Sequence, residues 1–199
     1  MSEPAKVQGV PRKRLNVEAL TSAAIDVADR DGFDALALTS VAAELDVAAS
    51  TLYTHVDGLD GLKSLVAVAA TQRLTETVRK CAIGTSGLDA LTAMALAYRA
   101  FALDHPGQFA STLLPPRSDL DELAPANATL INVFVLVYRA IGLEDHEAQL
   151  AARAMRSAIH GFLALEHTTT SPSEHDAEYR YLLDALQRGL LHRHAEVAG

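Results

Sequence analysis

The chain has 199 residues, a formal net charge of -8 and a hydrophobic content of 49%, which is enough for one compact body or two small ones. The acidic balance excludes a protein that coats nucleic acid non-specifically. The single cysteine, Cys81, excludes an intrachain disulfide and a metal site built from several cysteines. Alanine and leucine dominate and favour helix, whereas the alternating runs typical of strands are nearly absent. We therefore expect an all-α protein. No secretory signal or membrane span is apparent, so we expect it in the cytoplasm with no membrane partner.

Residues 1–14 are expected to form a disordered tail that ends in three cations, Arg12, Lys13 and Arg14. A basic arm of this kind can reach phosphates or the minor groove of DNA. The same composition is typical of a solvated tail, and the residues leave both interpretations open.

The apolar spacing predicts a first helix over about residues 16–30, with Asn16 as its N-cap and Gly32 as its stop. A core of three helices is then expected to be completed by the apolar residues that follow the stop, among them Phe33 and Leu36.

Residues 38–55 predict two short helices joined by a tight turn at Asp46, a residue type that tolerates left-handed backbone geometry. Thr39 is expected to cap the first of these helices, and the second is expected to span about residues 48–56. Two helices with such a turn form a helix-turn-helix, whose second helix can enter the DNA major groove.

The segment from Asn16 to Leu62 resembles the DNA-binding domain of the TetR/AcrR family of bacterial transcriptional regulators. The matching residues are Gly32-Phe33, Leu38-Thr39-Ser40-Val41-Ala42, Val47 and Thr51-Leu52-Tyr53-Thr54-His55-Val56. The resemblance implies an N-terminal three-helix helix-turn-helix DNA-binding domain at residues 15–58 and a C-terminal helical ligand-binding and dimerisation domain at residues 83–199. A helix at residues 59–82 would connect them, and residues 83–87 form the expected boundary loop.

The expected DNA-binding residues lie on the recognition helix or flank it: Arg12, Lys13, Arg14, Thr39, Ala49, Ser50, Thr51, Tyr53, Thr54, His55 and Lys63. The resemblance implies phosphate contacts from Tyr53, His55 and Thr39, while the small and hydroxyl side chains of the same helix would face base edges. Family members often carry a phosphate-binding lysine where this chain has Leu59, and Lys63 is the nearest substitute.

Few cations lie in the predicted DNA-binding domain itself. Between Leu15 and Gly58 the only one is Arg30, against eight acidic residues. Family members also usually have Gly where this chain has Asp46 and Ser where it has Ala48. These features favour an alternative interpretation, a helical small-molecule-binding or protein-interaction module whose DNA binding is weakened or lost.

The second part of the chain predicts further helices at about residues 88–104, 108–114, 120–141, 144–167 and 174–192. The expected ligand-pocket residues are mostly aromatic or apolar and lie on these helices: Tyr98, Phe101, Phe109, Phe134, Tyr138, Met155, Ile159, His160 and Phe162. The same residues also fit an ordinary core, in which His160 would be a buried histidine with a hydrogen-bond partner.

The last two long helices carry a stripe of small residues and an apolar face. The expected dimer-interface residues are Ala151, Ala154, Ala158, Gly161, Tyr181, Leu182, Leu186 and Leu190. Small residues permit close helix approach, and the resemblance implies a two-fold four-helix bundle there. Internal packing alone is the alternative.

No enzyme motif is present: the chain lacks a Gly-rich phosphate loop, a GxSxG elbow and a metal-ligand pattern among its eight histidines. We expect no enzymatic activity, no cofactor and no metal. The prediction is a homodimeric regulator that binds double-stranded operator DNA, most simply a repressor released from a palindromic operator by a small-molecule effector of unknown identity.

Overall fold

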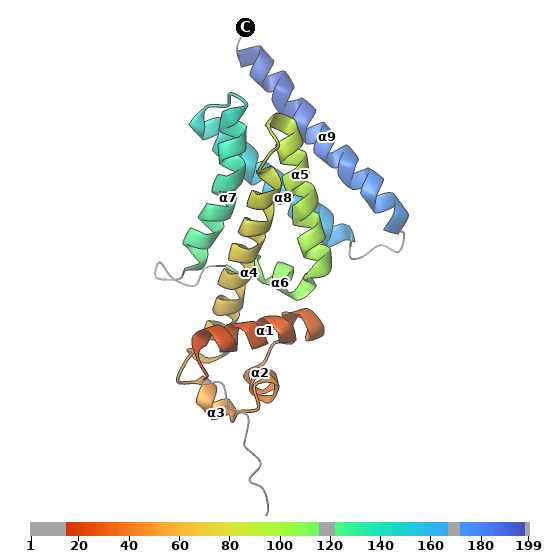
Figure 1. The fold of residues 1–199 in the computed structure, drawn as a ribbon. Helices are drawn as coiled ribbons and strands as arrows, with labels where there is room; N and C mark the ends of the chain where they lie inside the picture. Colours follow the sequence, from red (N-terminus) through yellow and green to blue (C-terminus); the bar gives the residue numbers. More distant parts are fainter. Residues whose placement is uncertain (1–14, 116–121, 167–171, 198–199) are drawn as a thin grey trace, which may run out of the picture.

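The computed structural model describes residues 15–115, 122–166 and 172–197, and in these ranges it consists of nine helices and no strand (Figure 1). The helices are α1 (Val17–Asp31), α2 (Leu38–Glu44), α3 (Ala49–Leu52), α4 (Gly58–Ala82), α5 (Gly87–Asp104), α6 (Pro106–Ser111), α7 (Leu123–Ala140), α8 (Asp145–Glu166) and α9 (Pro172–Val197). The expected all-α fold is confirmed. The proposed basic arm, residues 1–14, lies outside the described residues.

Helices α1 to α3 and the first turns of α4 enclose one small hydrophobic core (Figure 1). We call this part of the molecule the head. Leu20, Val41, Leu52 and Leu62 are fully buried in it. Asn16 caps α1 as predicted: its side-chain oxygen accepts a hydrogen bond from the backbone amide of Ala19 at 2.8 Å. The head is therefore held together by apolar residues drawn from four helices.

Two details of the helix-turn-helix differ from the prediction. Thr39 does not cap α2, because the helix begins at Leu38, two residues earlier than predicted, and its cap residue is Ala37, which makes no side-chain bond. Helix α3 spans only four residues, since the Thr54 hydroxyl donates to the Thr51 carbonyl at 2.8 Å and the backbone there forms tighter turns. The turn at Asp46 is as predicted, with a φ of 52°.

Helix α4 runs from the head into the C-terminal body (Figure 1), and it has buried residues in both its first and its second half. Leu62 and Val66 belong to the core of the head, whereas Leu74 and Val78 belong to the core of the body. One continuous helix thus packs in two separate hydrophobic cores and connects them directly.

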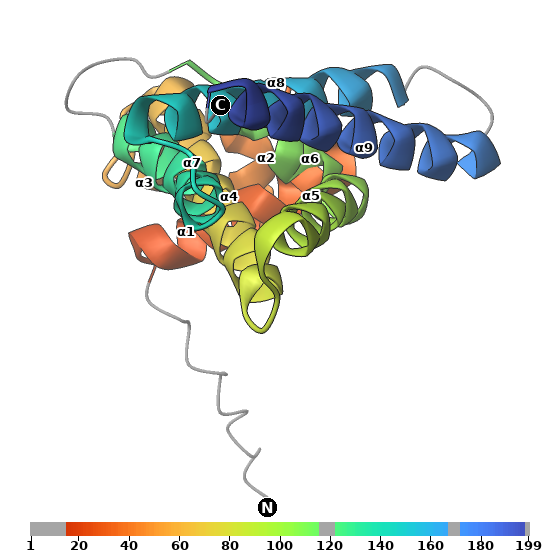
Figure 2. The same cartoon turned by 90° about the horizontal axis from the view of Figure 1, so that it is seen from above.

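The body is built from α5 to α9 around the second half of α4 (Figures 1 and 2). Its core contains Tyr98, Phe134, Tyr138 and Tyr179, each at most 1% exposed. Helix α9 lies on the outside, against α8 and α5 (Figure 2). The Tyr179 hydroxyl fixes it by donating to the Ala95 carbonyl of α5 at 2.7 Å.

Helix α7 is, within the described ranges, the one helix that is long and apolar enough to cross a membrane by length and composition, with a mean hydropathy of 1.3. Its residues Leu130, Phe134 and Tyr138 are buried, and it packs against both α4 and α8. This packing accounts for the buried apolar residues of α7 as those of a helix packed in a helical body.

Candidate DNA-binding and effector sites

The recognition helix presents polar side chains outward while one leucine anchors it. Leu52 is fully buried in the head, whereas Tyr53 is 62% exposed and Ser50, Thr51 and Thr54 are also exposed. Ala49 and His55 are half-buried, and Thr39 on α2 is exposed. The structure therefore leaves most of the predicted contact residues on α2 and α3 accessible to DNA.

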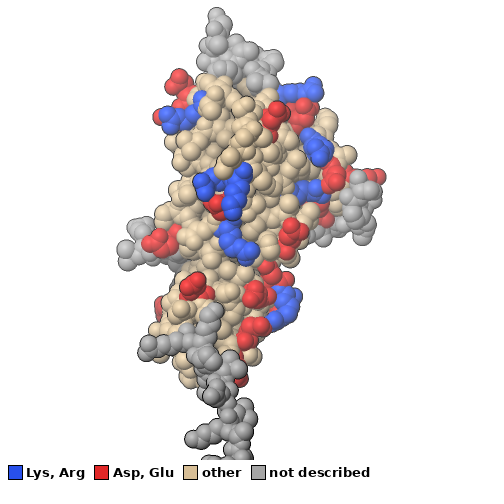
Figure 3. Space-filling view, in the orientation of Figure 1, with Lys and Arg blue, Asp and Glu red and all other residues tan. Residues whose placement is uncertain are grey.

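The two basic residues described in the head, Arg30 and Lys63, already interact with other side chains. Arg30 forms ion pairs with Asp31 at 3.1 Å and Glu44 at 2.8 Å, and these two carboxylates raise its pKa. The Lys63 ammonium lies 5.3 Å from the centre of the Phe33 ring, a cation–π contact. On the face drawn in Figure 3, whose lower part shows the head, several acidic side chains lie on this end of the molecule.

The predicted effector residues come together in one core. The Tyr98 hydroxyl and His160 Nε2 are 2.7 Å apart, and the His160 ring stacks on Phe109 of α6 with a centroid distance of 4.8 Å. Phe101, Phe134, Tyr138, Met155 and Ile159 are buried in the same cluster, and Phe162 is half-buried against Tyr179.

Burial lowers the pKa of His160 to about 4, and the positive charge of Arg156 adds to this effect. The imidazole is therefore neutral at pH 7. His160 Nδ1 and the Tyr138 hydroxyl are buried without a hydrogen-bond partner among the described residues. Both interpretations of His160 stay open, because a core histidine with Tyr98 as its partner is also a polar group available to a ligand.

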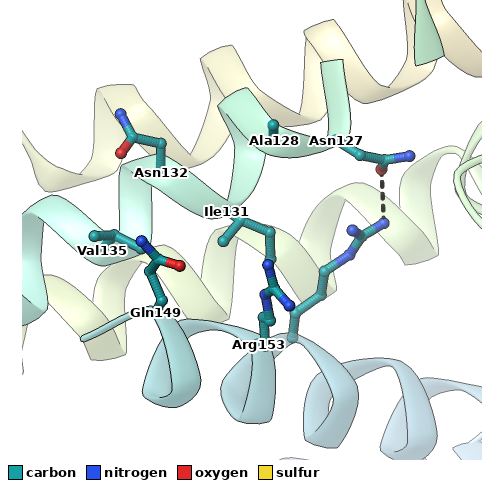
Figure 4. A pocket seen from close by; sticks show the side chains of 8 residues that line it. Asn127, Ala128, Ile131, Asn132, Val135, Gln149 and Arg153 are labelled. Carbon is teal, nitrogen blue, oxygen red and sulfur yellow. Dashed lines mark hydrogen bonds between the residues drawn. The ribbon is translucent and has the colours of Figure 1, made fainter. Parts of the chain in front are cut away.

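A cavity that the sequence did not predict lies between α7 and α8 (Figure 4). It has a volume of about 430 Å³ and is lined by Asn127, Ala128, Ile131, Asn132, Val135, Gln149, Arg153 and Arg156. None of the predicted effector residues belongs to its walls. The lining residues recur every three to four positions on each helix, but this pattern is a signal only once α7 and α8 are known to face each other.

The residues predicted for dimerisation divide into two groups. Ala154, Gly161 and Tyr181 are exposed, and Ala158 and Leu182 are half-buried. The others contribute to packing within the chain: Ala151 is only 6% exposed, and Leu186 and Leu190 pack on the core of the body. Ala151 packs within the chain because its position on α8 faces the core.

Head and body meet directly where α6 packs on α1. The Asp29 carboxylate of α1 accepts hydrogen bonds from the backbone amide of Gln108 at 2.8 Å and from its side-chain amide at 2.5 Å. Arg73 of α4 donates to the side-chain oxygen of the same glutamine at 2.5 Å. Gln108, which is fully buried, thus joins α1, α4 and α6.

These features, an exposed helix-turn-helix and a helical body joined by α4, have counterparts among known proteins. Residues 91–186 match the family model described as the tetracyclin repressor-like C-terminal domain. An uncharacterised HTH-type transcriptional regulator of Mycobacterium tuberculosis, Rv0681, is 31% identical over 156 residues, which are 78% of this chain and 72% of the relative.

Two solved structures share the fold. A TetR variant from Acinetobacter baumannii in complex with minocycline has a TM-score of 0.71 at 19% identity, with 90% of this chain and 98% of that chain covered. BioQ with its natural double-stranded DNA operator has a TM-score of 0.63 at 20% identity, with 88% and 99% covered. The exposed helix-turn-helix, the helical body and these relatives place the chain among the helix-turn-helix transcriptional regulators. It belongs to the TetR family of helix-turn-helix transcriptional regulators.

Proposed function

We propose that this chain is a homodimeric repressor that binds a roughly palindromic operator and leaves it when a small molecule binds the body. Residues 15–58 would read DNA, the helix at residues 59–82 would transmit the change, and residues 83–199 would sense the effector and dimerise. A regulator of this kind acts where the bacterial chromosome lies, in the cytoplasm. The observation that carries the proposal is the single helix α4, which is buried in the cores of both head and body.

The proposed dimer uses the outer face of α8 and α9. Leu150, Leu165 and Tyr181 on these helices are 55%, 68% and 76% exposed. Ala154 and Gly161 lie between them in the sequence of α8 and are exposed as well. Large exposed apolar side chains beside small ones favour a close helix-to-helix contact with a second copy, which would place two heads for two half-sites.

The proposed DNA contacts depend on neutral donors more than on described cations. Hydroxyl and imidazole groups of Thr39, Tyr53 and His55 would donate to phosphates. Helix α4 begins beside them at Gly58 and its cap residue, Asp57, makes no side-chain bond, so amides of its first turn stay available for phosphate. The long-range attraction would come from Arg12, Lys13 and Arg14.

Release would proceed through the contact between α6 and α1. An effector that is bound more tightly by one arrangement of the body than by another shifts the population of both. Because Gln108 ties α6 to Asp29 of α1 and to Arg73 of α4, a shift of α6 would turn the head and change the distance between the two recognition helices. Half-sites one DNA turn apart, or a multiple of it, tolerate little change in this distance.

Fluorescence anisotropy tests the DNA-binding part of the proposal. The purified protein is titrated against DNA from upstream of its own gene and against a scrambled duplex of equal length, at several salt concentrations. We expect specific binding that weakens steeply with salt, because phosphate neutralisation releases counterions. The proposal would be contradicted if promoter DNA and scrambled DNA bound with equal affinity at every salt concentration, both for this promoter and for neighbouring ones.

A further inference from the structure

Among the described residues, the walls of the cavity between α7 and α8 carry positive charge and no negative charge. Arg153 and Arg156 of α8 are the two ionised side chains in this set, which contains no carboxylate (Figure 4). Within the described residues, Arg153 makes no hydrogen bond and no ion pair. Its guanidinium therefore keeps all five donors for a ligand.

Arg156 is half-buried, and its hydrogen-bond partners within the described part of the chain are neutral. It donates to the Asn127 side-chain oxygen at 2.9 Å and to the Thr112 carbonyl at 3.3 Å. A guanidinium that is partly removed from water and meets only neutral oxygens gains more from an anion than an exposed one does, because its charge is uncompensated. The half-buried Arg156 and the exposed Arg153, three residues apart on one helix, together form a receptor for an oxyanion.

The rest of the cavity indicates what the anion is attached to. Ile131 and Val135, one turn apart on α7, supply an apolar wall, and Val135 is only 7% exposed. Asn132 and Gln149 supply amide groups at the opposite end of the labelled set in Figure 4. A volume of about 430 Å³ falls in the range of sites that hold small organic molecules.

We propose that this cavity is the effector site and that the effector is an organic carboxylic acid, with its carboxylate on Arg153 and Arg156 and its apolar part on Ile131 and Val135. The effector role rests on the function proposed above, whereas the anion site stands by itself. None of the aromatic residues around Tyr98 lines this site, which borders their cluster through Ile131, Val135 and Arg156.

Arg156 also gives the site a route to the head. It holds the carbonyl of Thr112, the residue that ends α6, and α6 holds α1 through Gln108 and Asp29. A carboxylate that takes the donors of Arg156 competes with this carbonyl, so occupancy of the cavity loosens one end of α6. The population of α6 positions then differs between the free and the bound protein.

Isothermal titration calorimetry of the full chain with naphthoate and with its neutral isostere naphthamide tests the site. We expect naphthoate to bind, and naphthamide to bind about tenfold more weakly or worse, because the amide cannot form a charge-assisted bidentate pair. Arg153→Gln should weaken naphthoate by a similar factor without affecting the fold, since this side chain is exposed and unpaired among the described residues. Arg180→Gln, an exposed arginine on α9, is the matched control and should bind as the wild type does.

Arg156→Lys gives a second measurement, since lysine keeps the charge but not the planar fork; we expect weaker binding of naphthoate and unchanged binding of naphthamide. Equal affinity for acid and amide, no binding at millimolar concentration, or wild-type affinity in Arg153→Gln would overturn the anion site. The same preparations are tested for operator binding by anisotropy. Operator binding without naphthoate binding would support the proposed regulator and contradict the anion site. If naphthoate binds through Arg153 but does not alter operator affinity, the result would support the anion site and contradict its role as the effector site.

Discussion

Gly107 of α6 lies against the backbone of Ala28 in α1 so closely that a methyl group has no place between them. A Cβ atom at residue 107 would overlap the Ala28 carbonyl and come within 2.7 Å of the Asp29 amide nitrogen. Backbone atoms cannot move aside as a flexible side chain can. Glycine is therefore required here by the close approach of the body to the head.

Gly107→Ala is expected to push α6 off α1 and to lower the free energy of unfolding by about 1–3 kcal/mol, the usual cost of overpacking. Urea denaturation followed by circular dichroism measures it. Gly61→Ala on α4 is the control, because a Cβ there meets its neighbours at 3.5 Å or more. Equal stability of the two variants would mean that the contact between α6 and α1 relaxes freely.

Removal of the three arm cations should weaken DNA binding in a manner that depends on salt. With Arg12, Lys13 and Arg14 all replaced by alanine, the slope of log affinity against log salt should become shallower by up to about three, roughly one for each phosphate that is no longer neutralised. Arg30→Ala should leave the slope unchanged, because Arg30 is already paired with Asp31 and Glu44. A slope unaffected by the triple change would assign the three cations to a solvated tail.

His160 should make the stability of the protein depend on pH. Its folded-state pKa of about 4 is below the ordinary value of 6.5, so the unfolded state binds more protons between these two values. Stability is then highest above pH 6.5 and falls as the pH drops toward 4, by about 2 kcal/mol between pH 7 and pH 5.

His160→Gln should remove this contribution while keeping a partner for the Tyr98 hydroxyl. Urea denaturation of wild type and variant at both pH values isolates the effect of His160, because the carboxylates titrate equally in the two proteins. An identical pH dependence of the two proteins would show that His160 is not held neutral by burial.

A charge on the outer face of α8 should separate the proposed dimer. Gly161→Arg places a long cation where a Cβ meets nothing within 4 Å, so the monomer is expected to fold normally and the dimer to dissociate. Ala100→Arg, on an exposed position of α5, should remain dimeric. Light scattering coupled to size exclusion gives the mass of each, and a dimeric Gly161→Arg variant would place the interface elsewhere.

The sequence predicted the helices well because their start and stop signals are local. Asn16 caps α1, and the turn at Asp46 has the expected left-handed backbone. The length of α3 could not be predicted, since it depends on whether Thr54 bonds to the Thr51 carbonyl or extends the helix. Local competition of this kind is decided by the packing around it.

The sites were predicted less completely, for a reason of geometry. Tyr98 and His160 were assigned to the same pocket, and the structure places them in hydrogen-bond contact across 62 residues. Arg153 and Arg156 were not assigned to any pocket, because a charged residue on a helix surface has no pattern that distinguishes a site from a solvated face. Only the packing of α7 against α8 brings Asn127 and Ile131 opposite them.

DNase I footprinting of the purified protein on the DNA upstream of its own gene tests the central claim most directly. We predict a discrete protected region whose two halves are related by approximate two-fold symmetry, with centres one helical turn apart or a multiple of it. Gly161→Arg should fail to protect this region at concentrations where Ala100→Arg protects it. Protection that is absent or uniform along this promoter and its neighbours would contradict a dimeric operator-binding regulator.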